Sequence, residues 1–386
     1  MQDGLRQEAR VSEPTRAVRP SRRFTASSSA SGSSVPPGSG LATGRVLEVD
    51  ALRGIACLVI LFHHLKPHLL PMGWAAVDLF FLLSGYLITS IILKNAGEPR
   101  FLWNFYVRRG LRIWPIYYLT ILVLVLASPI LPQASHLGGL ANLLTYTQYI
   151  QLYWSDRAPS FSPYLQHVWS LALEEQFYLI WPALVCLVGQ RGVVPLSLGL
   201  AVASVWARSS GFHWWLLLGR ADGLALGALL AAIIHRHSLT VLQTKTSTRV
   251  LTGIGLVALL YLVAQTATGG MATLDPPRWP GLSVLAVNLA GCSLVGLVLA
   301  NQGTARLQFL RNPRLVKIGQ LSYGLYLYHY ICLLLSDDLA KLAGLGGRPV
   351  WREALTMALV FVLAKLSWRC VEQPLLNLKN RFEYRS

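Results

Sequence analysis

The sequence predicts an all-α fold, a polytopic transmembrane bundle of about ten helices. Three observations lead to this fold class. First, 53% of the 386 residues are hydrophobic and only 13% are charged, about half the charged share of a typical soluble domain. Second, ten apolar runs approach the roughly 20 residues that a helix needs to cross a bilayer. Third, Lys and Arg concentrate in alternate loops between these runs.

The apolar runs define the predicted spans in chain order. The first and the ninth are short and carry polar groups. When the N-terminus is placed inside, the inner segments hold 23 Lys and Arg and the outer segments only 7. This is the distribution typical of cytoplasmic and external loops. We therefore expect a multi-pass protein of the plasma (inner) membrane with both termini in the cytoplasm. The ten spans are residues 52–66, 75–94, 113–131, 169–188, 193–209, 213–235, 249–267, 281–300, 321–336 and 350–371.

Composition divides the chain into three parts. Residues 1–45 are rich in Ser, Pro, Gly and Arg and contain no apolar run, which predicts a disordered, basic cytoplasmic tail and not a signal peptide. Residues 46–375 form one membrane domain, and residues 376–386 form a short cytoplasmic tail. The longest outer loop, 132–168, carries several aromatic residues. We expect it to fold back as a lid or an interfacial segment.

Charge and cysteine content narrow the possible partners. The net charge of +17 lies in loops between apolar runs, so the expected partner is the anionic inner leaflet of a bilayer and not nucleic acid. The five cysteines lie in or beside apolar segments, and none is paired at metal-ligand spacing. The sequence therefore predicts neither a disulfide framework nor a metal site.

Ionisable side chains inside the predicted spans are the first candidates for a functional site, because each costs at least about 2.5–3.5 kcal/mol to insert. Arg53 and His64 lie on the first span. Their spacing places them on one helix face, roughly 16 Å apart along the axis. Asp50, one turn earlier, can pair with Arg53, and His63 points away from that face. The alternative is that Arg53 extends to the inner surface and the histidines lie at the outer interface.

The second and third spans add a carboxylate, a hydroxyl and three arginines. Asp78 enters the second span, and Ser84 lies near its middle, where a small residue also favours close helix packing. Arg108, Arg109 and Arg112 precede the third span on its cytoplasmic side. These arginines either fix the topology or form a phosphate clamp, since Arg binds phosphate with two parallel hydrogen bonds.

The fourth and sixth spans carry further charges. Glu174 and Glu175 lie about one and a half turns into a helix that is entered from outside. Two adjacent carboxylates at this depth require partners, for which Arg53, Arg220 or a histidine are candidates. Arg220 and Asp222 lie within the sixth span. They belong either to the site or to a local ion pair that supports helix association.

The ninth span carries His329 among tyrosines that recur at helical spacing. A tyrosine stripe is more often a packing feature than a site, but His329 adds an ionisable group. Intramembrane Glu, Arg and His are typical of membrane enzymes and also of proton relays in a polytopic transporter or exporter. The sequence shows no matching halves of the kind that many transporters have.

The motifs around these residues resemble those of the acyltransferase-3 family of integral membrane O-acyltransferases. Each motif is weak alone, but together they are specific, and they run in the family's order across about residues 46–375. The matching elements are Asp50-x-Leu-Arg53-Gly, the pair Arg53 and His64, Phe80-Phe-x-x-Ser84-Gly-Tyr, Arg108-Arg109-x-x-Arg112-Ile-x-Pro115, Trp169-Ser-Leu-x-x-Glu174-Glu-Gln-Phe-Tyr, Arg220-x-Asp222-Gly-Leu-x-x-Gly and Ser322-Tyr-x-x-Tyr-x-x-His329.

The resemblance implies transfer of an acyl group, usually acetyl from acetyl-CoA, to a hydroxyl of a sugar, a cell-surface polysaccharide or a glycosylated natural product. It implies acyl-CoA as the donor substrate and no bound cofactor. Some members carry an extracytoplasmic hydrolase-like domain after the helices, whereas this sequence ends at Ser386. The chain is therefore expected either to complete the transfer alone or to pass the acyl group to a separate extracytoplasmic partner.

The resemblance also implies roles for individual residues. The catalytic candidates are Arg53, His64 and Glu174. His64 is the expected general base or acyl-relaying nucleophile, Glu174 orients or charge-balances its ring, and Arg53 fixes the thioester or stabilises the oxyanion. Two competing hypotheses are the transporter and a catalytically dead, acyltransferase-like receptor. Donor-binding candidates are Arg108, Arg109 and Arg112, and supporting candidates are Asp50, His63, Ser84, Glu175, Arg220, Asp222 and His329.

Overall fold

The computed structural model describes residues 45–131, 139–150, 162–267, 281–344 and 349–382. The predicted disordered tail lies outside the described residues except for Arg45, and so does much of the predicted lid between 132 and 168. From Val46 onwards the described residues belong to one compact unit. Within these ranges every regular element is a helix, which confirms the all-α fold class.

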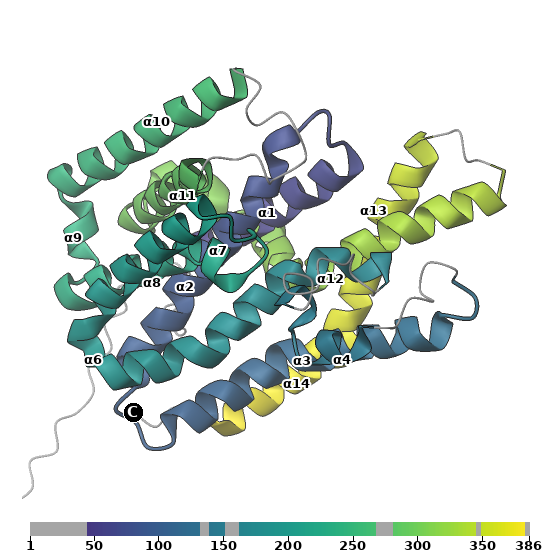
Figure 1. The fold of residues 1–386 in the computed structure, drawn as a ribbon, viewed down its shortest axis with the longest axis horizontal. Helices are drawn as coiled ribbons and strands as arrows, with labels where there is room; N and C mark the ends of the chain where they lie inside the picture. The colour runs from purple at the N-terminus through teal and green to yellow at the C-terminus, as the bar shows by residue number, and fades with distance from the viewer. Residues whose placement is uncertain (1–44, 132–138, 151–161, 268–280, 345–348, 383–386) are drawn as a thin grey trace, which may run out of the picture. The chain divides into compact units, whose positions relative to one another are not determined.

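The helices follow one another with short connections (Figure 1). In chain order they are α1 (Leu47–Leu65), η1 (Pro71–Ala75), α2 (Ala76–Asn95), α3 (Phe101–Ala127), α4 (Leu140–Leu144), η3 (Pro163–Val168), α6 (Trp169–Ser209), α7 (Leu217–Arg220), α8 (Asp222–His237), α9 (Thr240–Gln243), α10 (Lys245–Ala267), α11 (Gly281–Ala300), η5 (Ala305–Arg311), α12 (Pro313–Leu342), α13 (Pro349–Ser367), η6 (Trp368–Glu372), α14 (Gln373–Leu378) and η7 (Lys379–Phe382).

Six helical stretches among the described residues are long and apolar enough to cross a membrane, so the chain is a multi-pass membrane protein. All ten predicted runs lie largely on helices, but three of the helices, α1, α8 and α12, are not among the six. Two of the predicted spans belong to the single helix α6, which is interrupted at Gly189. The number of about ten spans therefore stays a prediction. The six stretches are Pro71–Asn95, Phe101–Ala127, Pro163–Ser209, Lys245–Ala267, Gly281–Ala300 and Val350–Leu378.

Close approach at glycines fixes the neighbours of α2. This helix packs along α8 (Figure 1). A Cβ atom at Gly85 would lie 2.0 Å from the backbone oxygen of Leu224, and one at Gly227 would lie 2.0 Å from that of Leu82. The two backbones touch because neither glycine has a side chain, as in the small-residue interfaces of membrane helices. The contact holds the middle of α2, with Ser84, against α8.

A second glycine contact positions the first helix. α1 packs along α12. A Cβ atom at Gly319 would lie only 1.8 Å from the backbone oxygen of Asp50, and one at Gly54 would lie 2.6 Å from that of Leu315. Arg53 is therefore held beside the start of α12, and the histidines at the far end of α1 are held beside the middle of α12.

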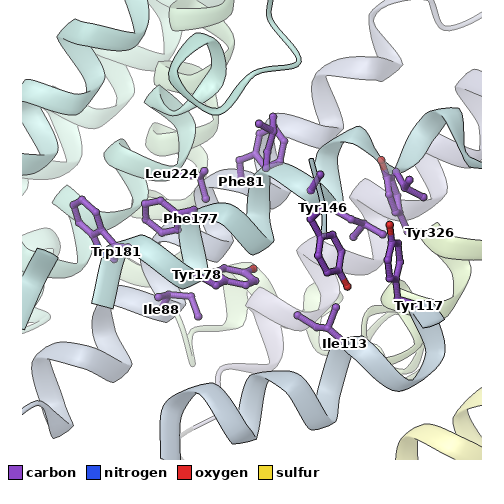
Figure 2. Packing of buried hydrophobic residues seen from close by; sticks show 14 of the residues in the cluster. Phe81, Ile88, Ile113, Tyr117, Tyr146, Phe177, Tyr178, Trp181, Leu224 and Tyr326 are labelled. Carbon is purple, nitrogen blue, oxygen red and sulfur yellow. The ribbon is translucent and has the colours of Figure 1, made fainter. Parts of the chain in front are cut away.

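Aromatic side chains fill the core between these helices (Figure 2). The rings of Phe177 and Trp181 on α6 stack with their centroids 5.0 Å apart, and those of Tyr117 and Tyr146 stack at 4.5 Å. By contrast, α10 buries only Ala258 and Leu262 among its described residues, so it presents most of its apolar side chains outward. A lipid environment explains such a surface.

Candidate active site

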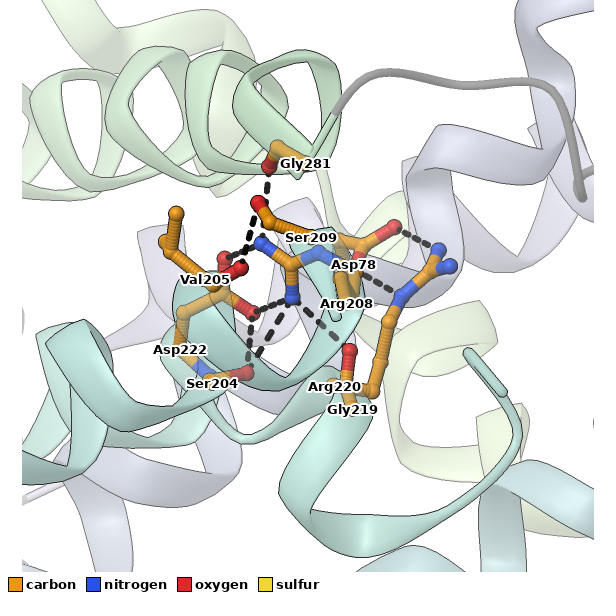
Figure 3. Close-up of polar contacts among 9 residues, drawn as sticks. All are labelled: Asp78, Ser204, Val205, Arg208, Ser209, Gly219, Arg220, Asp222 and Gly281. Carbon is orange, nitrogen blue, oxygen red and sulfur yellow. Dashed lines mark hydrogen bonds and ion pairs between the residues drawn. The ribbon is translucent and has the colours of Figure 1, made fainter. Parts of the chain in front are cut away.

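Two separate ion pairs connect the sixth predicted span to neighbouring helices (Figure 3). Arg220 donates from Nε to Oδ1 of Asp78 at 2.8 Å and from Nη2 to Oδ2 at 2.5 Å. Arg208 binds Asp222 in the same two-pronged way, at 2.9 and 2.8 Å. The local ion pair between Arg220 and Asp222 is therefore not the one that forms. Residues two apart on a helix do not face each other, so each turns to a different helix.

Arg208, at the end of the predicted span 193–209, has a side chain that is only 6% exposed. Its guanidinium also donates to the backbone oxygen of Gly219 at 2.8 Å and to that of Gly281 at 3.0 Å. It thus connects the end of α6 to α7 and to the start of α11. In the sequence it looks like any other arginine at the end of an apolar run, and no periodic signal distinguishes it.

Arg220 is surrounded by tryptophans. Its guanidinium carbon lies 5.4 Å from the ring centroid of Trp74, 5.7 Å from that of Trp169 and 5.5 Å from that of Trp214. The side chains of Arg220 and Asp78 are only 2% and 1% exposed. An ion pair closed in this way can hold helices together, but it cannot bind a substrate without first opening.

A pocket brings together candidate site residues from four helices. It is called the arginine pocket below. It contains three arginines, both adjacent glutamates and the serine at the middle of α2, so it unites candidates from α1, α2, α3 and α6. The lining residues are Arg53, Ser84, Leu87, Arg109, Arg112, Ile113, Leu171, Glu174, Glu175, Tyr178 and Tyr323.

A second hollow, the aromatic pocket, shares Arg53 and Glu174 with the arginine pocket. The guanidinium carbon of Arg53 lies 5.8 Å from the ring centroid of Phe80, and Nε of Arg53 is buried without a hydrogen-bond partner among the described residues. The remaining walls are mostly apolar. The full lining is Arg53, Val77, Phe80, Phe81, Ser170, Leu171, Glu174, Ser322, Tyr323 and Tyr326.

Hydroxyl groups hold the carboxylate of Glu174. Ser84 donates from Oγ to Oε1 of Glu174 at 2.9 Å. Tyr178, one turn after Glu174, has hydroxyl contacts of 3.1 Å with Oε2 of Glu174 and 2.8 Å with Oγ of Ser84. Tyr178 was not among the predicted site residues, although its spacing of four from Glu174 is a helical one. No hydrogen bond joins Glu174 to His64 among the described residues, so the orienting role expected for Glu174 has no contact to support it.

The three donor-binding candidates separate in space. Arg109 and Arg112 line the arginine pocket, and the guanidinium of Arg109 lies 5.0 Å from the ring centroid of Tyr178. Arg108 instead donates from Nη1 to the backbone oxygen of Phe382 at 3.1 Å. Glu175 accepts a hydrogen bond of 2.8 Å from Nε1 of Trp114.

The two histidines of α1 have different surroundings. Nδ1 of His63 is 2.8 Å from the backbone oxygen of Leu70, and a Cβ atom at Gly73 would lie 2.5 Å from Cβ of His63, so this ring fixes the turn after α1. The ring of His64 lies 4.9 Å from that of His329 between centroids. His329 in turn lies 4.8 Å from His167, a histidine that the sequence reasoning missed.

Tyr326 joins the histidines to the pockets. Its hydroxyl is hydrogen-bonded to Oγ of Ser170 and donates to the backbone oxygen of His167 at 3.1 Å. Tyr326 and Ser170 also line the aromatic pocket. A chain of polar residues therefore leads from Arg109 and Arg112, past Arg53 and Glu174, to the histidines.

The fold and the site define the class of protein, a multi-pass helical membrane protein with buried arginine, glutamate and histidine. Sequence comparison identifies the family. A family model described as an acyltransferase domain matches residues 46–368. The chain belongs to this acyltransferase-3 family of integral membrane O-acyltransferases. No solved structure shows a significant match to the chain.

Three relatives agree with this family. The peptidoglycan O-acetyltransferase OatA of Listeria monocytogenes is 28% identical over 354 residues, 86% of this chain and 56% of the relative. A putative O-acetyltransferase of Staphylococcus aureus (strain COL) is 29% identical, with 84% and 56% covered. The putative peptidoglycan O-acetyltransferase YrhL of Bacillus subtilis (strain 168) is 30% identical, with 85% and 54% covered. The chain thus spans about half the length of the curated relatives it matches.

Proposed function

We propose that the chain is a membrane-embedded O-acyltransferase that moves acetyl from acetyl-CoA to a hydroxyl of an extracytoplasmic carbohydrate, with peptidoglycan as the first acceptor to test. The observation that carries this proposal is the arginine pocket, in which Arg109 and Arg112 lie with Arg53 and Glu174. Family membership and the names of the relatives support the reaction type. The described contacts offer no support for a transporter.

The donor enters from the cytoplasm in this proposal, because Arg109 and Arg112 lie on the side that the basic loops assign to the cytoplasm. With the same orientation, we propose that both termini lie in the cytoplasm and that the protein lies in the plasma (inner) membrane. The two arginines hold the phosphates of CoA. The mostly apolar aromatic pocket beyond Arg53 has walls suited to the thin pantetheine arm.

His64 acts at the other end of the arm. Arg53 and His64 are eleven residues apart on α1, roughly 16 Å along a helix axis, so they cannot both contact one acyl carbon. We therefore assign Arg53 and Glu174 to the donor arm and His64 to the acceptor. Nε2 of His64 takes the proton from the acceptor hydroxyl, the oxygen bonds to the acyl carbon, the carbon–sulfur bond breaks, and the thiolate of CoA receives a proton.

Acceptor-dependent release of CoA tests the function. The purified chain in lipid vesicles, supplied with labelled acetyl-CoA, should release CoA and label soluble peptidoglycan fragments only when both substrates are present. Release without labelled fragments would contradict the proposed acceptor. A separate extracytoplasmic acyl-handling partner is the alternative for the last transfer step. Transfer by the purified chain alone would show that no such partner is needed.

Arg109→Ala should raise the KM for acetyl-CoA by about tenfold or more, because a hydrogen bond to a charged group contributes about 1.5–3 kcal/mol. The matched control is Arg108→Ala, which removes the neighbouring arginine that contacts Phe382 and does not line the pocket. Steady-state kinetics with varied donor concentration separates the two variants. Equal KM values for acetyl-CoA in Arg109→Ala and Arg108→Ala would mean that the arginines only fix the topology.

A further inference from the structure

Three imidazole rings meet where α1, η3 and α12 come together. The ring of His329 lies 4.9 Å from that of His64 and 4.8 Å from that of His167 between centroids. His329 is 2% exposed and His167 is 5% exposed. Tyr330 closes the group, with its ring 5.6 Å from both His64 and His167. The proposed transfer reaction uses only His64, so the other two histidines have no assigned role.

Backbone carbonyls fix which nitrogen of each ring carries hydrogen. A carbonyl oxygen can only accept, so the ring nitrogen that faces it must be the N–H of the neutral imidazole. The opposite nitrogen then holds a lone pair that can accept a hydrogen bond. The three contacts run from Nδ1 of His64 to the oxygen of Ile60 at 3.0 Å, from Nδ1 of His329 to that of Tyr326 at 2.5 Å, and from Nε2 of His167 to that of Leu327 at 3.0 Å.

The lone-pair nitrogens have no donor within the part of the chain that the structure describes. Nε2 of His329 and Nδ1 of His167 are buried without a hydrogen-bond partner, and no hydrogen bond reaches Nε2 of His64. A buried polar atom left in this state costs about 1–3 kcal/mol. Two such atoms lie on rings whose centroids are 4.8 Å apart, and the ring of His64 is 4.9 Å from one of them. They indicate a site whose ligand supplies the missing hydrogens.

The ligand must offer several hydrogen-bond donors. Among the described residues, no group of three or more His, Cys, Asp or Glu is arranged to hold a metal ion. One water molecule has two O–H bonds and cannot serve three acceptors. A hollow of about 10 Å³ beside His64 and His329 has room for one hydroxyl-sized group of a ligand. The other residues that line this hollow are mostly apolar: Leu61, Leu65, Leu333, Thr356, Met357 and Val360.

We propose that His329 and His167, together with His64, form a hydroxyl-binding subsite for a polyhydroxylated acceptor, a sugar ring. This inference rests on the proposed transferase function and names the chemistry of its acceptor. His329 and His167 are positioning residues. They accept hydrogen bonds from two hydroxyls and so direct a third hydroxyl to Nε2 of His64. A monohydric alcohol can reach His64 but cannot satisfy the other two nitrogens, so it should be a poor acceptor.

Two substitutions of His329 separate hydrogen bonding from folding and from proton transfer. Glutamine keeps an acceptor atom near the position of Nε2 but does not titrate, whereas leucine keeps bulk and accepts nothing. We expect His329→Leu to weaken binding of soluble peptidoglycan fragments by about tenfold and to raise their KM equally, with the KM for acetyl-CoA unchanged. His329→Gln should stay close to the wild type. His237→Ala, at an exposed position on α8, is the control.

Binding is measured by calorimetry without acetyl-CoA, and turnover is measured separately with the peptidoglycan fragments and with 1-propanol. Loss of preference for the fragments over propanol in His329→Leu supports the subsite. Equal losses in the leucine and glutamine variants, or unchanged binding in both, would overturn it. If the fragments bind in a His329-dependent way but are never acetylated, the proposed function fails while the subsite stands. If they are acetylated without this dependence, the subsite alone fails.

Discussion

Acyl transfer by His64→Ala should fall by at least about a hundredfold in kcat, because general acid–base catalysis contributes about 10²–10⁴-fold. The hydrogen bond from Nδ1 of His64 to the backbone oxygen of Ile60 leaves Nε2 as the proton acceptor. The His64 ring borders the hollow shared with His329, so Nε2 is placed to meet an acceptor. Alanine removes this base, and His64 is not one of the buried core residues. Quenched assays of labelled acetyl transfer measure the loss.

Two other histidines show whether the effect is chemical. His63→Ala removes a ring that is hydrogen-bonded to Leu70 and packed on Gly73, so we expect a lower melting temperature and a nearly unchanged kcat in the folded protein. His237→Ala, at an exposed position, should change neither. Turnover at the wild-type rate in His64→Ala would remove His64 from the mechanism, whereas equal losses in His63→Ala would point to a damaged helix end.

The periodicity and charge of the sequence predicted the helices well. The ten apolar runs lie largely on helices, and Arg53 and His64, expected on one face, both line pockets that include residues of α12. The span count could not be settled in the same way. The first run lies on a helix that carries Glu48, Asp50 and Arg53 and so has more charge than the six stretches allow. The two spans expected within α6 are separated only by the non-helical backbone of Gly189.

Contacts between helices were harder to predict. Helical spacing gives the direction of a side chain but not which helix packs on that face or at what depth. Asp78 therefore meets Arg220 from a distant part of the sequence, and Glu174 meets Ser84 where a histidine or arginine was expected. His167 lies at the end of the predicted outer loop 132–168 and has no periodic partner to single it out. Its closeness to His329 comes from the packing of η3 against α12, which spacing along the sequence does not give.

The largest expected loss of stability comes from breaking the pair of Asp78 and Arg220. Asp78→Ala should lower the free energy of unfolding by about 3–5 kcal/mol, since it leaves Arg220 as an uncompensated buried charge. The double variant Asp78→Leu with Arg220→Met removes both charges and should recover most of that loss, because apolar residues of similar volume often replace a buried pair at little cost. Denaturant unfolding in one detergent measures all variants.

The burial of an ion pair, and not its N–O distance, should determine how much stability is lost when the pair is broken. Lys66 and Glu353 form an ion pair with the same N–O distance of 2.5 Å, but their side chains are 37% and 21% exposed. Water screens this pair, so Glu353→Ala should cost no more than about 1 kcal/mol. Equal costs for Asp78→Ala and Glu353→Ala would show that the tryptophans around Arg220 do not exclude water. A double variant as unstable as Asp78→Ala would show that the charges are needed for packing itself, since removing the stranded charge would then bring no recovery.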